Sequence, residues 1–362
     1  MLYLILGFIA LAYLGANIYM YVKCMQMMHA APAWVKVDTS VLFLICFLSF
    51  FVSMVMRKAD TPLCLLSCIY MIGTAWLVFT LYMTLALILT DVLRIWWHDM
   101  KYWGFIVSFV IVVPLLGFGY MNYRHPDVNT YEIQVDKPMS SDVKIVGISD
   151  VHLGIGTGRK ALSRYVDMIM EEKPDVILIA GDLIDNSVVP LYRQNMIEEL
   201  ARLKAPMGVY MALGNHEYIS GIEESLDFLE KTPITVLRDS VVTLSCGLQI
   251  AGNDDYGKPE HVGIGSLIGQ ADMTRPFLLL DHFPGSVAYN STLGVDIQFS
   301  GHTHGGQIWP GNYIVDMLYE QSSGGKWWDK TFVYVSSGLS LWGPPFRIGT
   351  DSDMLVLKVR GK

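Results

Sequence analysis

Four long apolar runs occupy the first part of the chain, at residues 2–22, 41–56, 63–89 and 105–121. A helix needs about 20 apolar residues to cross the hydrocarbon core of a bilayer, and shorter runs reach across when their flanks contribute. Loops and open strands cannot span lipid because their backbone polar groups would lose their hydrogen bonds. We therefore predict that residues 1–122 form a transmembrane anchor of about four helices.

Two further features bear on this anchor. Aromatic side chains flank the runs, as in the belts at membrane–water interfaces: Trp34, Trp96, Trp97, Tyr102 and Trp103. The positive charges that set orientation are balanced, with Lys23, Lys36, Arg94 and Lys101 on one side and Arg57, Lys58, Arg124 and Lys137 on the other. The sequence thus leaves open which side of the membrane the rest of the chain faces.

Bulk charge argues against a nucleic-acid partner. The formal net charge is −8 at pH 7, which would repel a phosphate backbone. The five cysteines show no spacing typical of a disulfide framework.

The remainder of the chain has the pattern of an α/β domain. Residues 123–142 are predicted to form a linker and a first strand. From there strand patterns, such as 143–148 and 176–180, alternate with helical patterns, and the second half is richer in strands. This alternation predicts buried sheets with helices on their faces over residues 143–362.

Side chains that bind metals follow five of these predicted strands, directly after their carboxyl ends. In open α/β sheets those ends line the ligand crevice, so we expect these side chains to meet in one place. Mixed imidazole, carboxylate and amide ligands favour Mn, Fe or Zn over Mg or Ca. The number of these ligands is too large for one ion and suits two divalent ions. The side chains are Asp150, His152, Asp182, Asn215, His216, His282, His302 and His304.

The same segments resemble the motifs of the calcineurin-like metallophosphoesterases, in order and rough spacing, over about residues 143–359. The motifs are Asp150-Val151-His152, Gly181-Asp182-Leu183-Ile184-Asp185, Gly214-Asn215-His216-Glu217, His282 and Gly301-His302-Thr303-His304. The last continues as Gly-Gly-Gln, as in a bacterial membrane-associated subgroup of that family. The resemblance implies a sandwich of central β-sheets flanked by helices, with metal-dependent phosphoric ester hydrolase activity.

The resemblance also implies a role for each residue. Asp150, His152 and His304 would hold the first ion, and Asn215, His282 and His302 the second. Asp182 would bridge the two. His216 would stabilise the attacked phosphoryl group or protonate the leaving oxygen, and Asp185 would orient it. A plain helix N-cap or turn role is the alternative for Asp185.

These observations predict a membrane-anchored dinuclear phosphoesterase that hydrolyses a phosphodiester, pyrophosphate or phosphomonoester bond. The resembling subgroup includes enzymes that cleave the pyrophosphate of a nucleotide-linked lipid precursor, which makes a lipid-linked substrate attractive. We expect a multi-pass protein of the bacterial cytoplasmic membrane with the bilayer as a partner. The alternative is a catalytically silent membrane sensor or scaffold, but a degenerate site should lack a ligand and none is missing.

Three peripheral features each allow two interpretations. Arg347 could steady a phosphate oxygen or pair with a surface acid. The run Asn253-Asp254-Asp255 could edge the crevice or form a turn. Trp327 and Trp328, placed in a loop between Lys326 and Lys330, could meet lipid headgroups or pack ordinarily.

Overall fold

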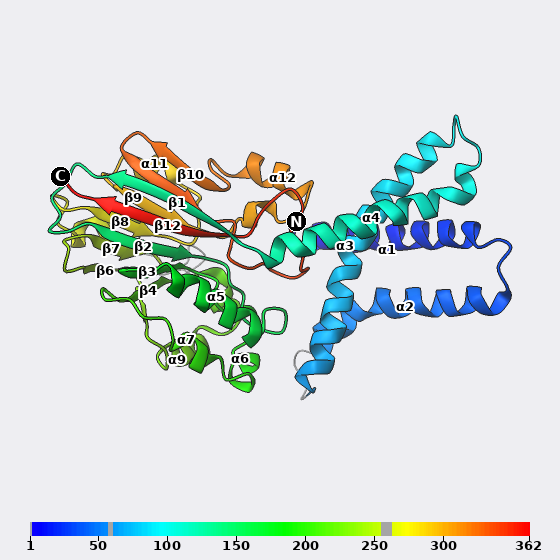
Figure 1. Ribbon diagram of the computed structural model, residues 1–362, viewed down its shortest axis with the longest axis horizontal. Coiled ribbons are helices and arrows are strands. Elements are labelled where there is room, and N and C mark those ends of the chain that lie inside the picture. The colour runs from blue at the N-terminus through cyan, green and yellow to red at the C-terminus, as the bar shows by residue number, and fades with distance from the viewer. Residues whose placement is uncertain (1, 57–60, 255–262) are drawn as a thin grey trace. The chain divides into compact units, whose positions relative to one another are not determined.

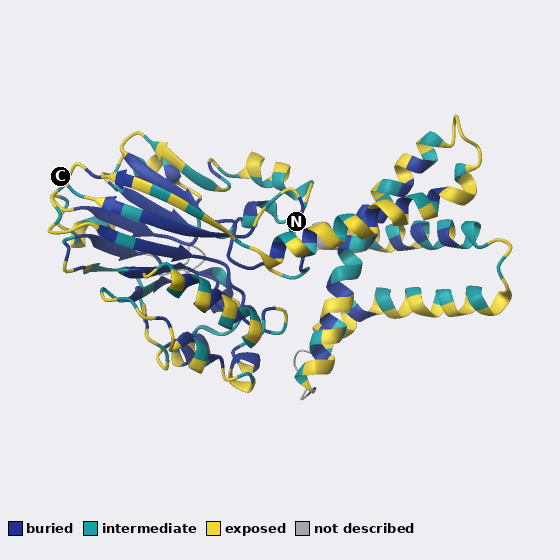
Figure 2. Cartoon of the chain, in the orientation of Figure 1, coloured by how far each residue is buried: buried dark blue, intermediate teal, exposed yellow. Residues whose placement is uncertain are grey.

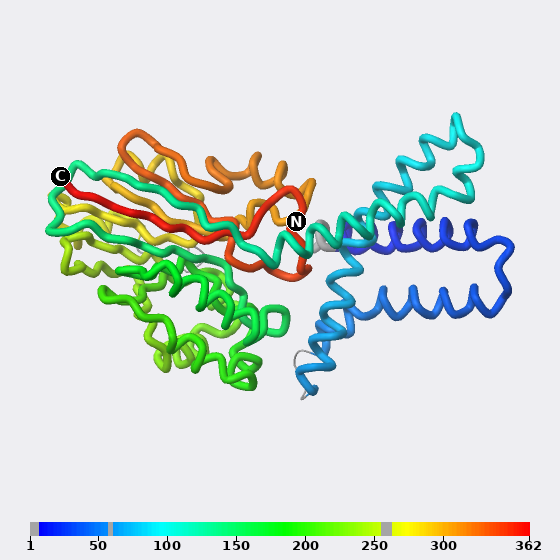
Figure 3. The backbone as a smooth tube through the Cα atoms, in the orientation of Figure 1, coloured from blue at the N-terminus to red at the C-terminus, as the bar shows by residue number. Residues whose placement is uncertain are grey.

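The computed structural model describes residues 2–56, 61–254 and 263–362 (Figure 1, Figure 3). The chain divides into two compact units, Met1–Met121 with Gly343–Phe346 and Asn122–Trp342 with Arg347–Lys362. Arg57, Lys58 and Asp255, which the sequence analysis considered, lie outside the described residues.

The first unit contains four long helices among its described residues: α1 (Leu2–Met27), α2 (Ala33–Met56), α3 (Leu63–Leu93) and α4 (Met100–Arg124). All four are long and apolar enough to cross a membrane. At most 39% of the apolar window of any of them is buried within the protein. Figure 2 accordingly shows these helices mainly in the colours of exposed and intermediate residues. Such apolar surface is stable only where something other than water covers it.

Small and polar residues join these helices. A Cβ on Gly73 of α3 would collide with backbone atoms of Phe50 on α2, so glycine permits the close crossing, as is common between membrane helices. The indole of Trp76 donates a hydrogen bond of 2.8 Å to Asn17. Lys23 and Asp91 form an ion pair between α1 and α3, near the ends of both helices.

The second unit is built on two six-stranded sheets of described residues, with strand orders β1-β12-β2-β3-β4-β5 and β10-β11-β9-β8-β7-β6. Neighbouring strands β2, β3, β4 and β5 are parallel, as are β7, β8, β9 and β11. The strands are β1 (Asp127–Gln134), β2 (Val143–Ile148), β3 (Val176–Ala180), β4 (Val209–Ala212), β5 (Ile234–Val236), β6 (Ser240–Thr243), β7 (Gln249–Gly252), β8 (Phe277–Leu280), β9 (Ile297–Ser300), β10 (Gly324–Trp328), β11 (Thr331–Val335) and β12 (Asp353–Arg360).

Helices cover the outer faces of the sheets, and Figure 1 shows α5, α7 and α9 together along the first sheet. They are α5 (Arg159–Glu171), α6 (Val189–Arg193), α7 (Met196–Leu200), α8 (Asn215–Ile219), α9 (Ile222–Leu229), α10 (Ile264–Gln270), α11 (Val287–Ser291), the 3₁₀ turn η1 (His304–Gly306) and α12 (Gly311–Leu318). One apolar core lies between the two sheets, and others lie between each sheet and its helices. The buried central strands explain the uninterrupted apolar runs in the sequence.

The structure corrects the predicted elements in two places. Trp327 and Trp328 lie on strand β10 rather than in a loop, because an antiparallel register with β11 pairs them with Phe332 and Thr331. The predicted linker after the last apolar run comprises only His125 and Pro126, since α4 continues to Arg124 and β1 begins at Asp127.

Candidate metal centre

Five loops carry the candidate ligands, and backbone hydrogen bonds join the loops to one another. They follow β2, β3 and β4 of the first sheet and β8 and β9 of the second. The amide of His152 donates to the carbonyl of Asp182 at 3.0 Å, and that of Gly301 donates to the carbonyl of His282 at 3.0 Å. The carboxyl ends of strands from both sheets therefore converge, as predicted.

The loop backbones are strained at the candidate ligands. Ten described non-glycine residues have a positive φ, and Asp150, His152, Asp182, His302 and His304 are five of them, with φ between 48° and 72°. Each such residue costs about 1 to 3 kcal/mol and persists only where its surroundings impose it. The strain thus falls on the residues whose side chains must be aimed at one point.

Asp150, His152 and His304 form one cluster, with ligand atoms within 4.8 Å of one another. The Nε2 atoms of His152 and His304 lie 3.1 Å apart, and Asp150 Oδ1 lies 3.4 Å from His304 Nε2. The other oxygen of Asp150 accepts hydrogen bonds from the Ser149 hydroxyl and, at 3.0 Å, from the amide of His302. These bonds orient the carboxylate so that Oδ1 faces the cluster.

Asp182, His282 and His302 form a second cluster of the same dimension. Asn215 joins it, because its Oδ1 lies 3.0 Å from His302 Nδ1 and 3.2 Å from His282 Nε2. The ring of His282 is held by a contact of 2.8 Å from its Nδ1 to the carbonyl oxygen of Ala180. That bond requires the proton on Nδ1, which leaves the lone pair of Nε2 directed into the cluster.

Asp182 lies between the two clusters. Its Oδ2 is 3.3 Å from His282 Nε2 in the second cluster and 3.8 Å from His152 Nε2 in the first. Its Oδ1 accepts a hydrogen bond of 2.8 Å from the amide of His216. Gly214 permits this approach, because a Cβ at that position would collide with Asp182 Oδ1.

The donor set fits divalent cations. Asp150 Oδ1, which faces the first cluster, is a buried polar atom without a hydrogen-bond partner. Ring nitrogens and carboxylate oxygens face one another at hydrogen-bond distances, although too few protons are available to satisfy them. A buried set of unsatisfied lone pairs is costly unless a cation accepts them.

The pKa shifts of the histidine rings also show that the carboxylates of the centre attract positive charge. Burial opposes protonation of His152 and His282, yet carboxylates, chiefly Asp150 and Asp185 for His152 and Asp182 for His282, raise the pKa of each ring to about 10. Burial lowers the pKa of His302 to about 4 and that of His304 to about 3, which keeps both rings neutral. The carboxylates thus attract cations, while two neutral imidazoles offer lone pairs to bind them.

His216 lies at the edge of this centre. Its ring is buried and packs edge-on against the ring of His152, with centroids 4.5 Å apart. Its Nδ1 lies 2.6 Å from the backbone carbonyl oxygen of Asp185 and 3.5 Å from that residue's carboxylate. A ligand atom of His216 is also within 4.8 Å of those of His152 and Asp182, so the geometry permits a direct contact with an ion as well. The closest orienting partner is therefore the main chain of Asp185.

Glu217 received no role from sequence reasoning, although it belongs to one of the motifs. It is fully buried and its carboxylate accepts hydrogen bonds from the amides of Asp182 at 3.0 Å, Ile184 at 2.9 Å and Gly214 at 2.8 Å. It thereby ties two ligand-bearing loops together. Nothing but its position beside Asn215 and His216 could have indicated this role.

Both interpretations of Arg347 were wrong. Its side chain is fully buried and donates to backbone carbonyls rather than to an acid or toward the cluster. Nη1 donates to His304 at 2.5 Å, and Nη2 donates to Ser340 at 2.7 Å and to Ser337. Burial lowers the pKa of Arg347 to about 10, which still leaves it charged at neutral pH. Arg347 therefore holds the loop that carries His304 against the loop after β11.

The other peripheral residues have structural partners. Asp254 is buried, ion-paired with Arg238 at 3.1 Å and bonded to the Tyr218 hydroxyl at 2.5 Å, so its carboxylate is engaged by the protein. Trp328 donates its indole proton to Gln321 at 2.7 Å and lies under the ammonium of Lys326.

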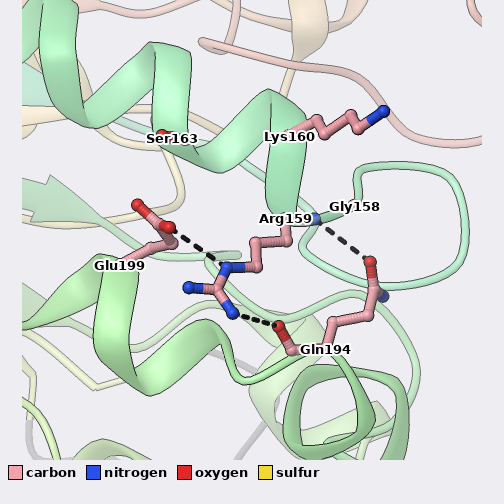
Figure 4. Close-up of a pocket in the computed structure, with 6 residues that line it drawn as sticks. All are labelled: Gly158, Arg159, Lys160, Ser163, Gln194 and Glu199. Carbon is pink, nitrogen blue, oxygen red and sulfur yellow. Dashed lines mark hydrogen bonds and ion pairs between the residues drawn. The ribbon is translucent and has the colours of Figure 1, made fainter.

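A pocket of about 590 Å³ on the second unit lies apart from the ligand residues and is lined by Gly158, Arg159, Lys160, Ser163, Gln194 and Glu199 (Figure 4). Its guanidinium is already paired, because Arg159 donates to Glu199 at 3.1 Å and to the carbonyl of Gln194 at 3.5 Å. The pocket thus lacks the convergent unsatisfied donors that mark the metal centre.

Comparison with known proteins decides the family. A profile of the calcineurin-like phosphoesterases matches residues 143–306. An uncharacterized metallophosphoesterase of Aquifex aeolicus is 31% identical over 265 residues, covering 70% of this chain and 98% of that protein. The chain belongs to the calcineurin-like metallophosphoesterase family. The prediction of a metal-dependent phosphoric ester hydrolase is thereby confirmed at the level of the family.

Two further relatives extend the similarity beyond that profile. An uncharacterized metallophosphoesterase of Campylobacter jejuni is 28% identical over 399 residues and aligns with all of both chains. A Danio rerio protein named as a transmembrane protein with a metallophosphoesterase domain is 30% identical over 280 residues, covering 70% of this chain and 62% of that protein. Together with the four apolar helices, this relative supports a membrane protein.

Chelation of divalent ions should lower the thermal stability of the second unit. An ion present at about 1,000 times its dissociation constant stabilises the folded state by about 4 kcal/mol. For a domain of this size that corresponds to a fall in the melting temperature of roughly 8–16 °C with EDTA. Circular dichroism of the detergent-solubilised chain measures it. The Asp182→Ala chain is the control, since it should melt at the same temperature with and without EDTA; an equal fall in both chains would contradict the metal centre.

Replacing Arg347 should destabilise the loop that carries His304. Arg347→Met leaves several buried carbonyls without donors, at about 1 to 3 kcal/mol each, so we expect a loss of about 3 kcal/mol and a lower bound-metal content. Thermal melting and elemental analysis provide the two measurements. Arg202→Met is the matched control, because exposed Arg202 makes only surface contacts among the described residues, with Glu199, Asp167 and the Ser163 hydroxyl, and its loss should cost less than about 1 kcal/mol. Equal losses in the two variants would refute the role of Arg347.

Proposed function

We propose that the chain is a membrane-anchored dinuclear metallophosphoesterase that hydrolyses a phosphodiester, pyrophosphate or phosphomonoester bond. One observation carries the proposal: two clusters of buried donors share Asp182 between them, at the carboxyl ends of both sheets. The family match supports the reaction class but leaves the substrate open.

In this proposal Asp150, His152 and His304 hold one divalent ion, and Asn215, His282 and His302 hold the other. Asp182 contributes to both. Paired ions in such sites polarise a phosphoryl oxygen and activate water for attack at neutral pH. Imidazole and carboxylate ligands favour Mn, Fe or Zn.

His216 is proposed to act on the substrate itself. It lies at the edge of the ligand cluster, and the carbonyl of Asp185 holds its Nδ1, so its Nε2 is the atom left to contact a phosphoryl or leaving-group oxygen. From there it can donate a hydrogen bond to the developing charge or a proton to the leaving oxygen. The contribution of Asp185 is to position this ring.

Residues 1–122 are proposed to serve as the membrane anchor, residues 123–142 as connection and first strand, and residues 143–362 as the hydrolytic domain. The anchor would keep the domain beside a bilayer, in our proposal the bacterial cytoplasmic membrane. That location suits a lipid-linked phosphate ester, which remains in the membrane while its headgroup is cleaved.

A catalytically silent sensor is the competing function. Such a protein needs a binding cavity but has no need for strained loops that aim seven metal ligands at one another. All seven donors lie in the two clusters or beside them, and five of them have strained backbones. We therefore favour hydrolysis.

Hydrolysis of bis-p-nitrophenyl phosphate with Mn²⁺ tests the reaction. The full chain in detergent should release p-nitrophenol, and Asp182→Ala and His302→Ala should each lower kcat/KM at least 100-fold because an ion loses a ligand. Asp227→Ala, which removes an exposed acid on α9, is the control and should retain activity. Undiminished activity in both ligand variants would eliminate the assigned centre.

A second kinetic comparison distinguishes the role of His216 from that of Asp185. His216→Asn should reduce kcat about 10²- to 10⁴-fold, the usual contribution of a general acid. Asp185→Asn keeps the backbone carbonyl that holds the ring, so kcat should fall less than about tenfold. If Asp185→Asn is as damaging as His216→Asn, the carboxylate rather than the carbonyl orients the histidine.

A further inference from the structure

Helix α12 (Gly311–Leu318) exposes an apolar face. Tyr313, Ile314, Met317 and Leu318 are 59%, 53%, 78% and 73% exposed. Their spacing places them on one side of the helix, since residues three and four apart share a face. No residue of α12 is buried, and Figure 2 shows the helix in the colours of exposed and intermediate residues. Trp309, just before the helix, is 41% exposed.

The acidic side chains at the end of α12 are exposed, and each also accepts a hydrogen bond from the protein. Asp316 accepts a hydrogen bond from the hydroxyl of Ser322, and Glu320 accepts one of 2.8 Å from the amide of Ala288. A surface helix of a soluble domain normally presents its polar residues to water and its apolar residues to the core. Helix α12 departs from this arrangement, because it exposes four apolar side chains as well as Asp316, and this indicates an apolar environment on its outer side.

This helix is joined directly to the metal centre. It contacts η1, which carries His304, and a Cβ on Gly306 would collide with backbone atoms of Gly311 and Asn312. Tyr319 ends the helix and packs on Phe283 with ring centroids 5.7 Å apart. Phe283 in turn lies 5.2 Å from the ring of His302. Aromatic contacts thus lead from the end of α12 to a candidate metal ligand.

A bilayer is the nearest apolar environment that the chain provides. The apolar helix α4 ends at Arg124 and strand β1 begins at Asp127, so only His125 and Pro126 intervene. Two extended residues span about 7 Å, so strand β1 starts within that distance of the end of α4, a helix apolar enough to cross a membrane. A lipid surface is therefore always within reach of this unit, at a high effective concentration.

We propose that α12 lies in the headgroup–acyl boundary of the bilayer and holds the metal centre against the membrane surface, an inference that rests on the proposed membrane anchoring. Tyr313, Ile314, Met317 and Leu318 insert, with Trp309 at the interface, where aromatic rings are favoured. The aromatic contacts through Tyr319 and Phe283 then place the centre beside the lipid phase. The substrate class that fits is a phosphate ester with an acyl or prenyl chain that stays in the membrane.

Burial of apolar surface, rather than attraction of charge, drives this contact. The charged residues of α12 and its end are acidic, Asp316 and Glu320, whereas helices that depend on anionic lipid carry Lys or Arg on the polar face. The contact should therefore form equally on zwitterionic and anionic membranes and persist at high salt.

Fluorescence quenching by brominated lipid tests the insertion. The full chain, with its native cysteines replaced and Met317→Cys labelled with an environment-sensitive dye, is reconstituted in phosphatidylcholine vesicles with and without dibromo-phosphatidylcholine. The matched control is Ala201→Cys, an exposed position just after α7 and far along the chain from α12. We expect a blue-shifted emission at 317 and quenching at least threefold greater than at 201, unchanged in 1 M NaCl or with phosphatidylglycerol.

Two results would overturn the proposal. Equal quenching at the two positions would mean that α12 stays in water. A blue shift without bromolipid quenching, which grows with the number of chains per vesicle, would mean that a second copy of the chain covers the helix.

A kinetic comparison tests the consequence for substrate access. Ile314→Asp combined with Met317→Asp should raise KM about tenfold for a hexadecyl p-nitrophenyl phosphate held in vesicles and leave kcat/KM for soluble bis-p-nitrophenyl phosphate within twofold. An equal effect on both substrates would refute a role in lipid access. Failure of the unaltered chain to cleave either substrate would refute the proposed hydrolysis, whereas the quenching measurement would still decide where α12 lies.

Discussion

Lone pairs that face one another in a buried space determine the architecture of the hydrolytic unit. Imidazole nitrogens and carboxylate oxygens from both sheets lie within about 3 to 4 Å of each other, as in the 3.1 Å contact between His152 and His304. Such an arrangement opposes folding unless cations share the space, because desolvated donors without partners are costly. The backbone adds to this cost, since five of the ligand residues have a positive φ. We infer that this unfavourable centre is kept because it binds cations.

Two buried residues with ionisable side chains, neither of them in the donor clusters, hold this arrangement in place. Glu217 accepts three backbone amides from the loops that carry Asp182 and Asn215, and Arg347 donates to the backbone of His304 and of the loop after β11. Arg347 uses its charge to bind neutral main-chain groups, and such hydrogen bonds are stronger than those between neutral partners. They fix the loops, and the loops fix the ligands. Removing either would therefore disturb the centre without touching a ligand side chain.

The chain connects the proposed membrane anchor directly to the hydrolytic unit. A helix apolar enough to cross a bilayer passes into the first strand of the hydrolytic unit with only two residues between them. In our proposal the unit works near a lipid surface, and helix α12, with its outward apolar face, leads to the loop of His304. These features favour substrates that remain in the lipid phase.

Patterns that depend on local spacing were readable from the sequence. The apolar runs predicted the four long helices, and the buried strands Val143–Ile148 and Val176–Ala180 were found at the predicted positions. The position of each ligand after a strand predicted that the ligands would meet. Three features could not be predicted from the sequence. They are the pairing of Trp327 and Trp328 in β10, the carbonyl of Asp185 as the partner of His216, and the burial of Arg347 and Glu217. Hydrogen bonds to main-chain atoms cannot be predicted from residue type, because nearly every residue carries the same carbonyl and amide groups. The sequence by itself determined which side chains could bind metal and which strands they follow. Only the tertiary structure decided which backbone groups hold them, since those partners are far apart in the chain, as are the His302 amide and the Asp150 carboxylate, 152 residues apart.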